Sequence, residues 1–504
     1  MVDFSKARNG SPTCSVGGKY LHSVYNPERE AERFVGALQC DFSPKFVVLT
    51  EPGLPYCVPF LRRRFPSAKI AAVRFCDDFS ETDKNWDFVF FADENFSAKL
   101  FDTLGEEGIA CALFASWQPS DALFPKKTAL CWQKIREAVL KSRDVIATRS
   151  FFARRWLKNT VRFFATANRF ATVLPGSSDI VVAASGPSLK IYFDELKKYR
   201  EKYFLIAVSS ALYPLVSHGI IPDLCISSDG GQWAKRHLDV LFENTDLPVA
   251  LSAESASSGF VLSKNPIVPL LYGDAPERIF MENFGIRALK AFRNGTVSGT
   301  AVQLALGLTR GRVFCFGLDL SEAKGFQHTQ PNALDAINSI SENRINTRAT
   351  RLSLAGRQNG ALSIYRDWFS SRDGDFSARV FRFSAENLSP LGKIADLGLN
   401  DFQVIFQKMD VKSKPSVKIL DEIYLKNDRA ERIEVVKKTL EDAKKLSVND
   451  KKSELWLKNI FPAEYLHYEK YFGTEIQKNA EAELLEKRDN FFSELISDFE
   501  RKWK

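Results

Sequence analysis

The chain has 504 residues, which is too long for one compact core and predicts about two or three domains. Its 45% hydrophobic content is that of a folded globular protein, and its net charge of +8 is modest for 70 basic and 62 acidic residues. No stretch approaches the roughly 18 to 20 apolar residues of a membrane span, and the N-terminus lacks an apolar signal segment. Eight cysteines without CxxC pairs or Cys/His clusters indicate reduced thiols. These features exclude a membrane-spanning protein and a disulfide scaffold, and they predict a cytoplasmic location.

Residues 1–140 are predicted to form a Rossmann-like N-terminal domain. Apolar segments alternate there with segments of helical character, which is typical of a parallel sheet. The expected strands are 46–50, 69–75, 87–92 and 110–115. The loop after the first strand, residues 50–56, contains two prolines that remove amide donors. We therefore expect this loop to have a structural or partner-binding role rather than to bind a ligand.

Residues 141–174 are predicted to form a helical linker. Its basic and aromatic stretch, 149–164, contains the residue types that bind single-stranded nucleic acid. However, the aromatic residues at 152, 156, 163 and 164 recur at helical spacing, which favours a packed helix with arginine side chains that reach solvent. Nucleic acid is therefore not expected as a partner.

A central domain is predicted for residues 175–405, and it begins with an interior strand at Ile180 to Ala184. Ser185, Gly186, Pro187 and Ser188 follow this strand and lead into a helix. Small residues and free amides at a helix start favour phosphate binding. An ordinary strand-to-helix turn is the alternative.

Polar residues follow three further strands of this domain. Because parallel strands place their carboxyl ends at one edge of a sheet, we expect these groups to meet over one ligand. The residues are Ser209 and Ser210 after one strand, Asp229 after the next, and Gly317 and Asp319 after a strand at 312–316. A small-residue loop before the helix 301–307 adds Thr296, Ser298, Gly299 and Thr300. The sequence thus predicts a nucleotide pocket in an α/β domain with a mostly parallel sheet.

Residues 406–504 are predicted to form a C-terminal helical domain, with helices at 417–446, 454–461 and 474–503. The last helix has an apolar stripe at 484, 485, 491, 492, 495 and 496. Packing against the body of the protein is the favoured role of this stripe. Oligomerisation through these helices is the alternative.

The order of three motifs carries a resemblance to a known family. GPSL at 186–189, SGTAVQLALG at 298–307 and GLDL at 317–320 follow each other as in the motility-associated-factor glycosyltransferases that modify flagellin. A Ser-x-Tyr-x-Pro pattern within 21–32, and Trp156 with Asn159, are similar to further elements of that family. The central domain of the family resembles bacterial sialyltransferases that use CMP-activated sugars, and a hydroxymethylpterin diphosphokinase-like domain. The resemblance covers roughly residues 170–400.

The resemblance implies an inverting glycosyltransferase that moves a nonulosonic acid from a CMP-activated donor to Ser or Thr of flagellin. Of the five histidines, His328 lies just after GLDL, where many family members have a histidine, and it is expected to be the general base. A surface histidine without a role is the alternative, and His237 is placed to approach the pocket. Tyr365 is expected to donate to the phosphate, with a buried core tyrosine as the alternative. No DxD motif is present, so no metal is expected to be obligatory, although Mg²⁺ can assist.

The chain also departs from the sialyltransferase pattern. Ser185 stands where the related loop has asparagine, and Ser209 or Ser210 replaces a second asparagine, so recognition of the base and ribose is expected to differ from that of CMP. Two other functions are therefore kept. One is a hydroxymethylpterin diphosphokinase-like enzyme, and the other is a non-catalytic protein that binds flagellin or a nucleotide sugar.

Overall fold

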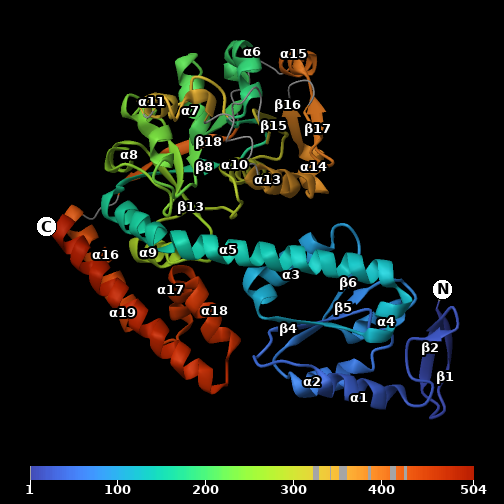
Figure 1. Cartoon of the computed structure of the whole chain (residues 1–504). Coiled ribbons are helices and arrows are strands. Elements are labelled where there is room, and N and C mark those ends of the chain that lie inside the picture. Colours follow the sequence, from blue (N-terminus) through green and yellow to red (C-terminus); the bar gives the residue numbers. More distant parts are fainter. Residues whose placement is uncertain are drawn as a thin grey trace. The chain divides into compact units, whose positions relative to one another are not determined.

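The computed structural model describes residues 2–321, 328–340, 342–350, 360–383, 388–408, 416–424 and 428–503 (Figure 1). The predicted α/β class, with a large, mostly parallel sheet and C-terminal helices, is confirmed. Contacts divide the chain into two compact units: Met1–Ala153 with Leu446–Glu494, and Arg154–Lys445 with Leu495–Lys504. The predicted division into three domains and a helical linker stays a prediction.

The first unit contains a parallel sheet with strand order β6-β5-β4-β7. Its strands are β4 (Phe46–Thr50), β5 (Lys69–Arg74), β6 (Phe88–Phe91) and β7 (Ala112–Ser116), close to the predicted ranges. Val47 and Leu49 pack in one core with α1 (Pro27–Ala37) and α2 (Cys57–Arg64). Val48, between them, packs in a second core with α3 (Phe96–Ala110) and the start of α5 (Pro125–Thr166). Alternate side chains thus bury both faces of the sheet, and helices cover each face, as expected for a Rossmann-like domain (Figure 1).

Shorter elements complete this unit. An antiparallel sheet, β1 (Asp3–Lys6), β2 (Pro12–Val16) and β3 (Lys19–Tyr20), precedes α1, and α4 (Gln118–Leu123) follows β7. The helices α17 (Lys451–Ile460) and α18 (Pro462–Lys470) return to the N-terminal sheet, as does the first part of α19 (Glu475–Trp503). One ion pair joins the two segments, with 2.5 Å between Lys45 Nζ and Glu469 Oε2.

The second unit is built on a larger sheet with strand order β17-β16-β15-β9-β10-β11-β12-β13-β8-β18, and with β14 paired to β13. Every pairing is parallel except that of β18 with β8. The strands are β8 (Arg169–Leu174), β9 (Ile180–Ala183), β10 (Phe204–Val208), β11 (Leu224–Ser227), β12 (Val249–Ser252), β13 (Ile267–Leu271), β14 (Leu289–Lys290), β15 (Val313–Phe316), β16 (Val380–Phe383), β17 (Ala395–Leu397) and β18 (Lys418–Tyr424). From β9 the chain first builds outward through β10 to β13 and then continues on the other side of β9 with β15. The topological switch point, where α/β sheets bind ligands, therefore lies between β9 and β15.

Helices pack on this sheet and place the loops at its carboxyl edge. The mainly apolar α10 (Val297–Leu308) buries Ala301, Val302 and Ala305 against β9, β10 and β15. Further helices that the described residues of this unit form are α6 (Phe193–Lys198), α7 (Ser209–Ser217), α8 (Gly259–Lys264), α9 (Glu277–Phe284), α11 (Asp335–Ile340), α13 (Gly360–Ser370), α14 (Asp375–Arg379), α15 (Leu399–Lys408) and α16 (Arg429–Lys445). Two 3₁₀ segments matter for the site, Pro187–Tyr192 after β9 and Ala234–Phe242 after β11.

Two of the expected elements are wrong. The helix predicted at 417–446 begins only at Arg429, and Lys418–Tyr424 forms β18. Its partner β8 occupies the end of the segment predicted as a helical linker, since α5 stops at Thr166. Both strands contain β-branched and aromatic residues, and each satisfies its backbone by pairing with the other, which a local helical pattern does not reveal. The tail helix is confirmed, and Leu484, Phe491, Phe492 and Leu495 of its stripe are buried within the chain.

None of the helices formed by the described residues is long and apolar enough to cross a bilayer. All eight cysteines are described and have free thiols.

Candidate active site

The backbone amides of the loop after β9 donate hydrogen bonds within the protein. Gly186 N donates to Gly317 O at 2.8 Å, Pro187 has no N–H, and Ser188 N donates to Asp319 Oδ2 at 2.7 Å. The Ser188 hydroxyl donates to the other oxygen of the Asp319 carboxylate. The expectation of free amides for a phosphate in this loop is therefore wrong. The donors instead join the ends of β9 and β15, because the two strands are neighbours in the sheet.

Asp319 has a structural place in this arrangement. Its side chain is buried, with 5% of the residue exposed, and burial raises its pKa while the two hydrogen bonds from Ser188 oppose that rise. Both carboxylate oxygens accept from Ser188, so Asp319 joins the loop after β9 to the end of β15.

Gly317 is required where these two loops cross. It has φ of 65°, and a Cβ there would collide with the backbone carbonyl of Ala184. Gly317→Ala is expected to destabilise the protein by about 1–3 kcal/mol, seen as a lower midpoint in thermal or urea unfolding. Gly307→Ala is the matched control, because Gly307 lies inside α10 with nothing within 4 Å of a Cβ, and it is expected to stabilise by up to about 1 kcal/mol. Equal midpoints for the two variants would contradict the steric argument.

Three predicted residues form a hydrogen-bonded chain above this crossing. The Ser210 hydroxyl donates to Ser185 Oγ at 2.8 Å, and Ser185 Oγ lies 2.9 Å from His328 Nδ1. The segment that carries His328 is fixed to the same loop, since Thr329 N donates to Ser185 O at 2.7 Å. The loop after β9, the start of α7 after β10 and the segment that carries His328 are thus bonded together.

A serine next to a histidine resembles a nucleophile with its base, but the surroundings favour another role. A nucleophilic serine needs backbone donors beside it for the developing oxyanion. The amides of Gly186 and Ser188 are already bonded, and Pro187 has none. Ser185 is therefore placed to orient the His328 ring through Nδ1.

His237 lies close to His328 on the 3₁₀ segment after β11. The two ring centroids are 6.4 Å apart with planes at 81°. Burial lowers the pKa of His237 to about 4, and His328 adds to this, while Asp229 and Asp239 oppose it. Burial also lowers the pKa of His328, with Asp335 acting in the opposite direction. Both imidazoles are neutral at pH 7 and can accept or donate without a net charge in the site.

The predicted Asp229 and Tyr365 are close enough to interact electrostatically. Asp229 is exposed after β11, and its carboxylate accepts from Gly231 N at 2.7 Å. The side chain of Tyr365, on α13, is close enough to Gly295 that a Cβ there would approach its ring carbon to 2.8 Å. Burial raises the pKa of Tyr365, and the nearby Asp229 raises it further, so its hydroxyl stays protonated as a donor.

The loop before α10 has the local geometry of a helix start. The Thr296 hydroxyl accepts from Ser298 N at 3.3 Å and caps the helix, and the Thr300 hydroxyl donates to Phe292 O at 3.3 Å. Gly299 packs tightly under Asn294, where a Cβ would come within 3.0 Å of that side chain. Ser209 begins α7 after β10 and is buried.

The Trp-x-x-Asn element fixes two neighbouring loops. Asn159 Nδ2 donates to Glu254 O at 2.8 Å and to Gly230 O at 3.4 Å, and the Trp156 ring leaves no room for a side chain at Gly230. These loops follow β11 and β12, so the element holds in place the backbone next to Asp229.

Sequence reasoning missed a charged group beside these loops. The Arg293 guanidinium binds both Glu254 oxygens, at 2.7 and 2.9 Å, and its Nε lies 3.1 Å from Asp274. Glu277, the first residue of α9, is 1% exposed, and neither of its carboxylate oxygens has a hydrogen-bond partner among the described residues. Burial raises the pKa of Glu277 to about 8, and Glu254 adds to this while Arg293 opposes it. A glutamate in the first turn of a helix is common on protein surfaces, so the sequence carried no signal for its burial.

The described residues contain no group of three or more His, Cys, Asp or Glu side chains that could hold a metal ion.

In the N-terminal unit, the loop after β4 is occupied by its own side chains. Glu51 is fully buried, and its carboxylate accepts from Phe75 N at 2.5 Å and from Arg74 Nη1 at 3.0 Å. Gly53 N donates to Glu51 Oε1 at 3.3 Å, and Leu54 N donates to His22 Nε2 at 2.8 Å. These bonds support the structural role expected for the loop.

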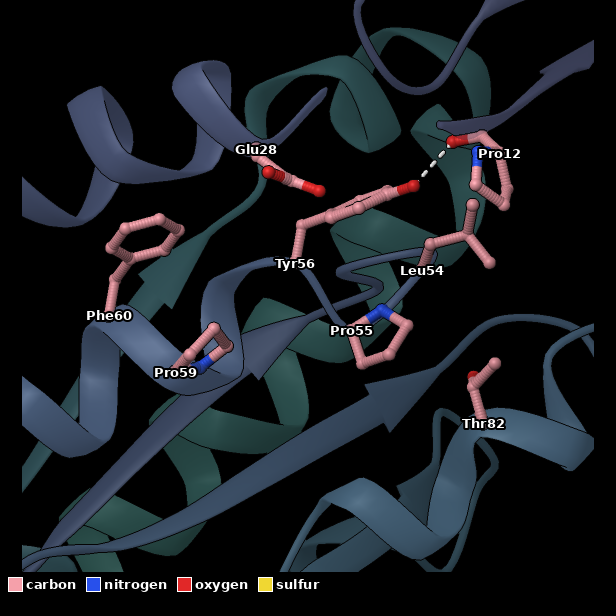
Figure 2. Close-up of a pocket in the computed structure, with 8 residues that line it drawn as sticks. All are labelled: Pro12, Glu28, Leu54, Pro55, Tyr56, Pro59, Phe60 and Thr82. Atoms are coloured by element: carbon pink, nitrogen blue, oxygen red, sulfur yellow. Dashed lines mark hydrogen bonds between the residues drawn. The ribbon is translucent and has the colours of Figure 1, made fainter. Parts of the chain in front are cut away.

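A pocket of about 430 Å³ lies on the outer side of this loop (Figure 2). Its lining is mostly proline, aromatic and aliphatic: Pro12, Leu54, Pro55, Tyr56, Pro59 and Phe60, with Glu28 and Thr82. Figure 2 shows the Tyr56 hydroxyl pointing to Pro12, whose carbonyl it reaches at 2.6 Å. An apolar ring or side chain suits this lining, whereas a phosphate would meet only the negative charge of Glu28.

Comparisons with known proteins find similarity over different parts of the chain. Residues 154–325 match the family model described as 6-hydroxymethylpterin diphosphokinase MptE-like. An uncharacterized protein of Treponema pallidum (strain Nichols) is 30% identical over 313 residues, which are 62% of this chain and 69% of that protein. A second uncharacterized protein of the same organism is 26% identical over 119 residues, or 22% of this chain and 55% of that protein. The structure of the MAf glycosyltransferase from Magnetospirillum magneticum AMB-1 aligns with 100% of this chain and 92% of its own, with a TM-score of 0.46 and 14% identity.

Proposed function

We propose that this chain, whose motifs resemble those of the motility-associated-factor family and whose centre matches an MptE-like family model, is a cytoplasmic glycosyltransferase. Its donor is a CMP-activated nonulosonic acid, and its acceptor is a Ser or Thr hydroxyl of flagellin. The observation that carries the proposal is the Ser210–Ser185–His328 chain at the switch point of the large sheet.

His328 acts as the general base in this proposal. Its Nδ1 is bonded to Ser185, so Nε2 removes the proton of the acceptor hydroxyl while that oxygen attacks the anomeric carbon of the sugar. The bond between sugar and phosphate breaks, and CMP leaves with the bonding electron pair. The hydroxyl of Tyr365, kept protonated by burial and by Asp229, donates to the departing phosphate. No metal ion is obligatory in this scheme, although Mg²⁺ can assist.

The test uses the full-length chain, CMP-pseudaminic or CMP-legionaminic acid, and purified flagellin. We expect the intact mass of flagellin to rise by one or more sugar residues. His328→Gln is the control, and it is expected to leave the flagellin mass unchanged. No mass gain with either donor, or an equal gain with the variant, would overturn the proposal.

A second candidate is supported by the family model over residues 154–325, which is named for a 6-hydroxymethylpterin diphosphokinase. This enzyme class transfers a diphosphate from ATP to the pterin hydroxyl and releases AMP. AMP formation that depends on 6-hydroxymethylpterin, without sugar transfer, would select this candidate. Binding of CMP-sugar and flagellin without either product would select a non-catalytic binding protein.

A further inference from the structure

At the switch point of the large sheet, the loop after β9 lacks free backbone amides that could donate hydrogen bonds to a ligand phosphate. Ligand phosphates at such points are commonly held by backbone amides of the first strand-to-helix loop. Here the amides of Gly186 and Ser188 already donate hydrogen bonds to Gly317 and Asp319, and Pro187 has no N–H. An anionic ligand at this place therefore requires other donors.

Arg293 does not supply them. Its guanidinium is held by Glu254 and Asp274, and the buried Glu277 lies nearby. This group has a surplus of carboxylates, which disfavours an added anion. His328 and the side chains beside it are the other polar groups described at these strand ends.

His237 has an unused ring nitrogen there. The residue is 9% exposed, and its Nδ1 is buried without a hydrogen-bond partner among the described residues. Leaving a buried polar atom unpaired costs about 1–3 kcal/mol, which a ligand oxygen would offset. Its ring lies edge-on to that of His328, with the planes at 81° and the centroids 6.4 Å apart.

We propose that His237 is a ligand-binding residue whose Nδ1–H donates to a phosphate oxygen of a nucleoside monophosphate or its ester, opposite His328. The inference rests on the proposed function, because it places the phosphate of the CMP donor. The two histidines then have different roles: His328 accepts the proton of the acceptor hydroxyl, and His237 donates a hydrogen bond to the phosphate of the leaving group.

The neutral state of His237 suits this role. The groups that face it are His328, Asp229 and Asp239, and burial, the largest effect, keeps the imidazole uncharged at pH 7. A neutral imidazole donates one N–H without repelling a second histidine. A bound phosphate stabilises the charged form, so the pKa of His237 is expected to rise when the ligand binds.

The experiment follows the ring C–H signals of the five histidines by NMR in the full chain, assigned with single variants and titrated with CMP alone. We expect the His237 and His328 signals to shift and the pKa of His237 to rise by at least one unit on binding. His237→Gln is expected to weaken CMP binding about tenfold, measured by calorimetry. His467→Gln, in the other unit, is the control and should bind as the wild type does.

An unchanged CMP affinity in His237→Gln, or a His237 signal that stays fixed while CMP binds, would overturn the inference. An absence of CMP binding to the wild-type chain would overturn it as well. If CMP binds at His237 but flagellin gains no sugar, the inference stands and the proposed transferase activity fails. If sugar is transferred and His237→Gln behaves as the wild type, the activity stands and this inference fails.

Discussion

Replacing His328 by glutamine is expected to reduce sugar transfer about 100- to 10,000-fold. Glutamine can keep a hydrogen bond to Ser185 but cannot take a proton from the acceptor. CMP affinity is expected to change by less than threefold, because the lost group acts on the acceptor. The measurement is the rate of mass gain of flagellin at saturating donor, together with calorimetry for CMP.

The rate of sugar transfer by the wild type is expected to depend on pH through the protonation of His328. Only the neutral imidazole is a base, and burial holds the pKa of His328 below its ordinary value of 6.5. The rate should therefore stay level around pH 7 and fall only as the pH drops below 6.5. His467→Gln is the control and should keep both the rate and the profile. A His328→Gln variant that retains the rate and this acid limb would place the base elsewhere.

Glu277 is expected to make the free energy of unfolding depend on pH. Its folded-state pKa is raised to about 8 from 4.5, so its contribution is most favourable below about pH 4.5 and is lost as the pH rises to about 8. The loss is on the order of 4 kcal/mol, because an ionised carboxylate has to stay buried beside Glu254. Glu277→Gln keeps the shape without the titration. It is expected to remove most of this slope and to exceed the wild type in stability at pH 8 to 9.

Glu282→Gln is the matched control for this prediction. Glu282 lies on the same helix, α9, and its side chain is 60% exposed while paired with Arg278. A change of at most about 0.5 kcal/mol, without an altered slope, is expected. The measurement is the unfolding midpoint by calorimetry from pH 5 to 9. Parallel curves for the wild type and Glu277→Gln would show that Glu277 is not the group that titrates.

The sequence predicted the strands of the N-terminal parallel sheet and, in the large sheet, β9, β10, β11 and β15, but it gave no expectation for β12, β13 or β16, which are also interior and apolar. Val47 to Leu49 and Ile180 to Ala183 are examples, because burial on both faces leaves a continuous apolar run. It failed for β8 and β18, an edge pair whose strands become recognisable only through each other. Long-range pairing of this kind is not encoded in either segment alone.

The candidate site divides in the same way. Residues that follow strand ends, such as Ser185, Ser210 and His328, could be placed together because topology brings parallel strand exits to one edge. What each group bonds to could not be predicted. The Ser188 amide was expected to face a ligand and faces Asp319 instead, and the burial of Glu277 follows from how α9 packs rather than from its own sequence.

The N-terminal unit has the strand arrangement of a Rossmann-like sheet, and the side chain of Glu51 fills the loop after its strand β4. The Glu51 carboxylate takes up the loop amide of Gly53, the Phe75 amide and the Arg74 guanidinium, a role that a bound phosphate has in many relatives of this architecture. Such a domain needs no small molecule to complete its fold. The thermal stability of this unit is therefore expected to be indifferent to added mononucleotides.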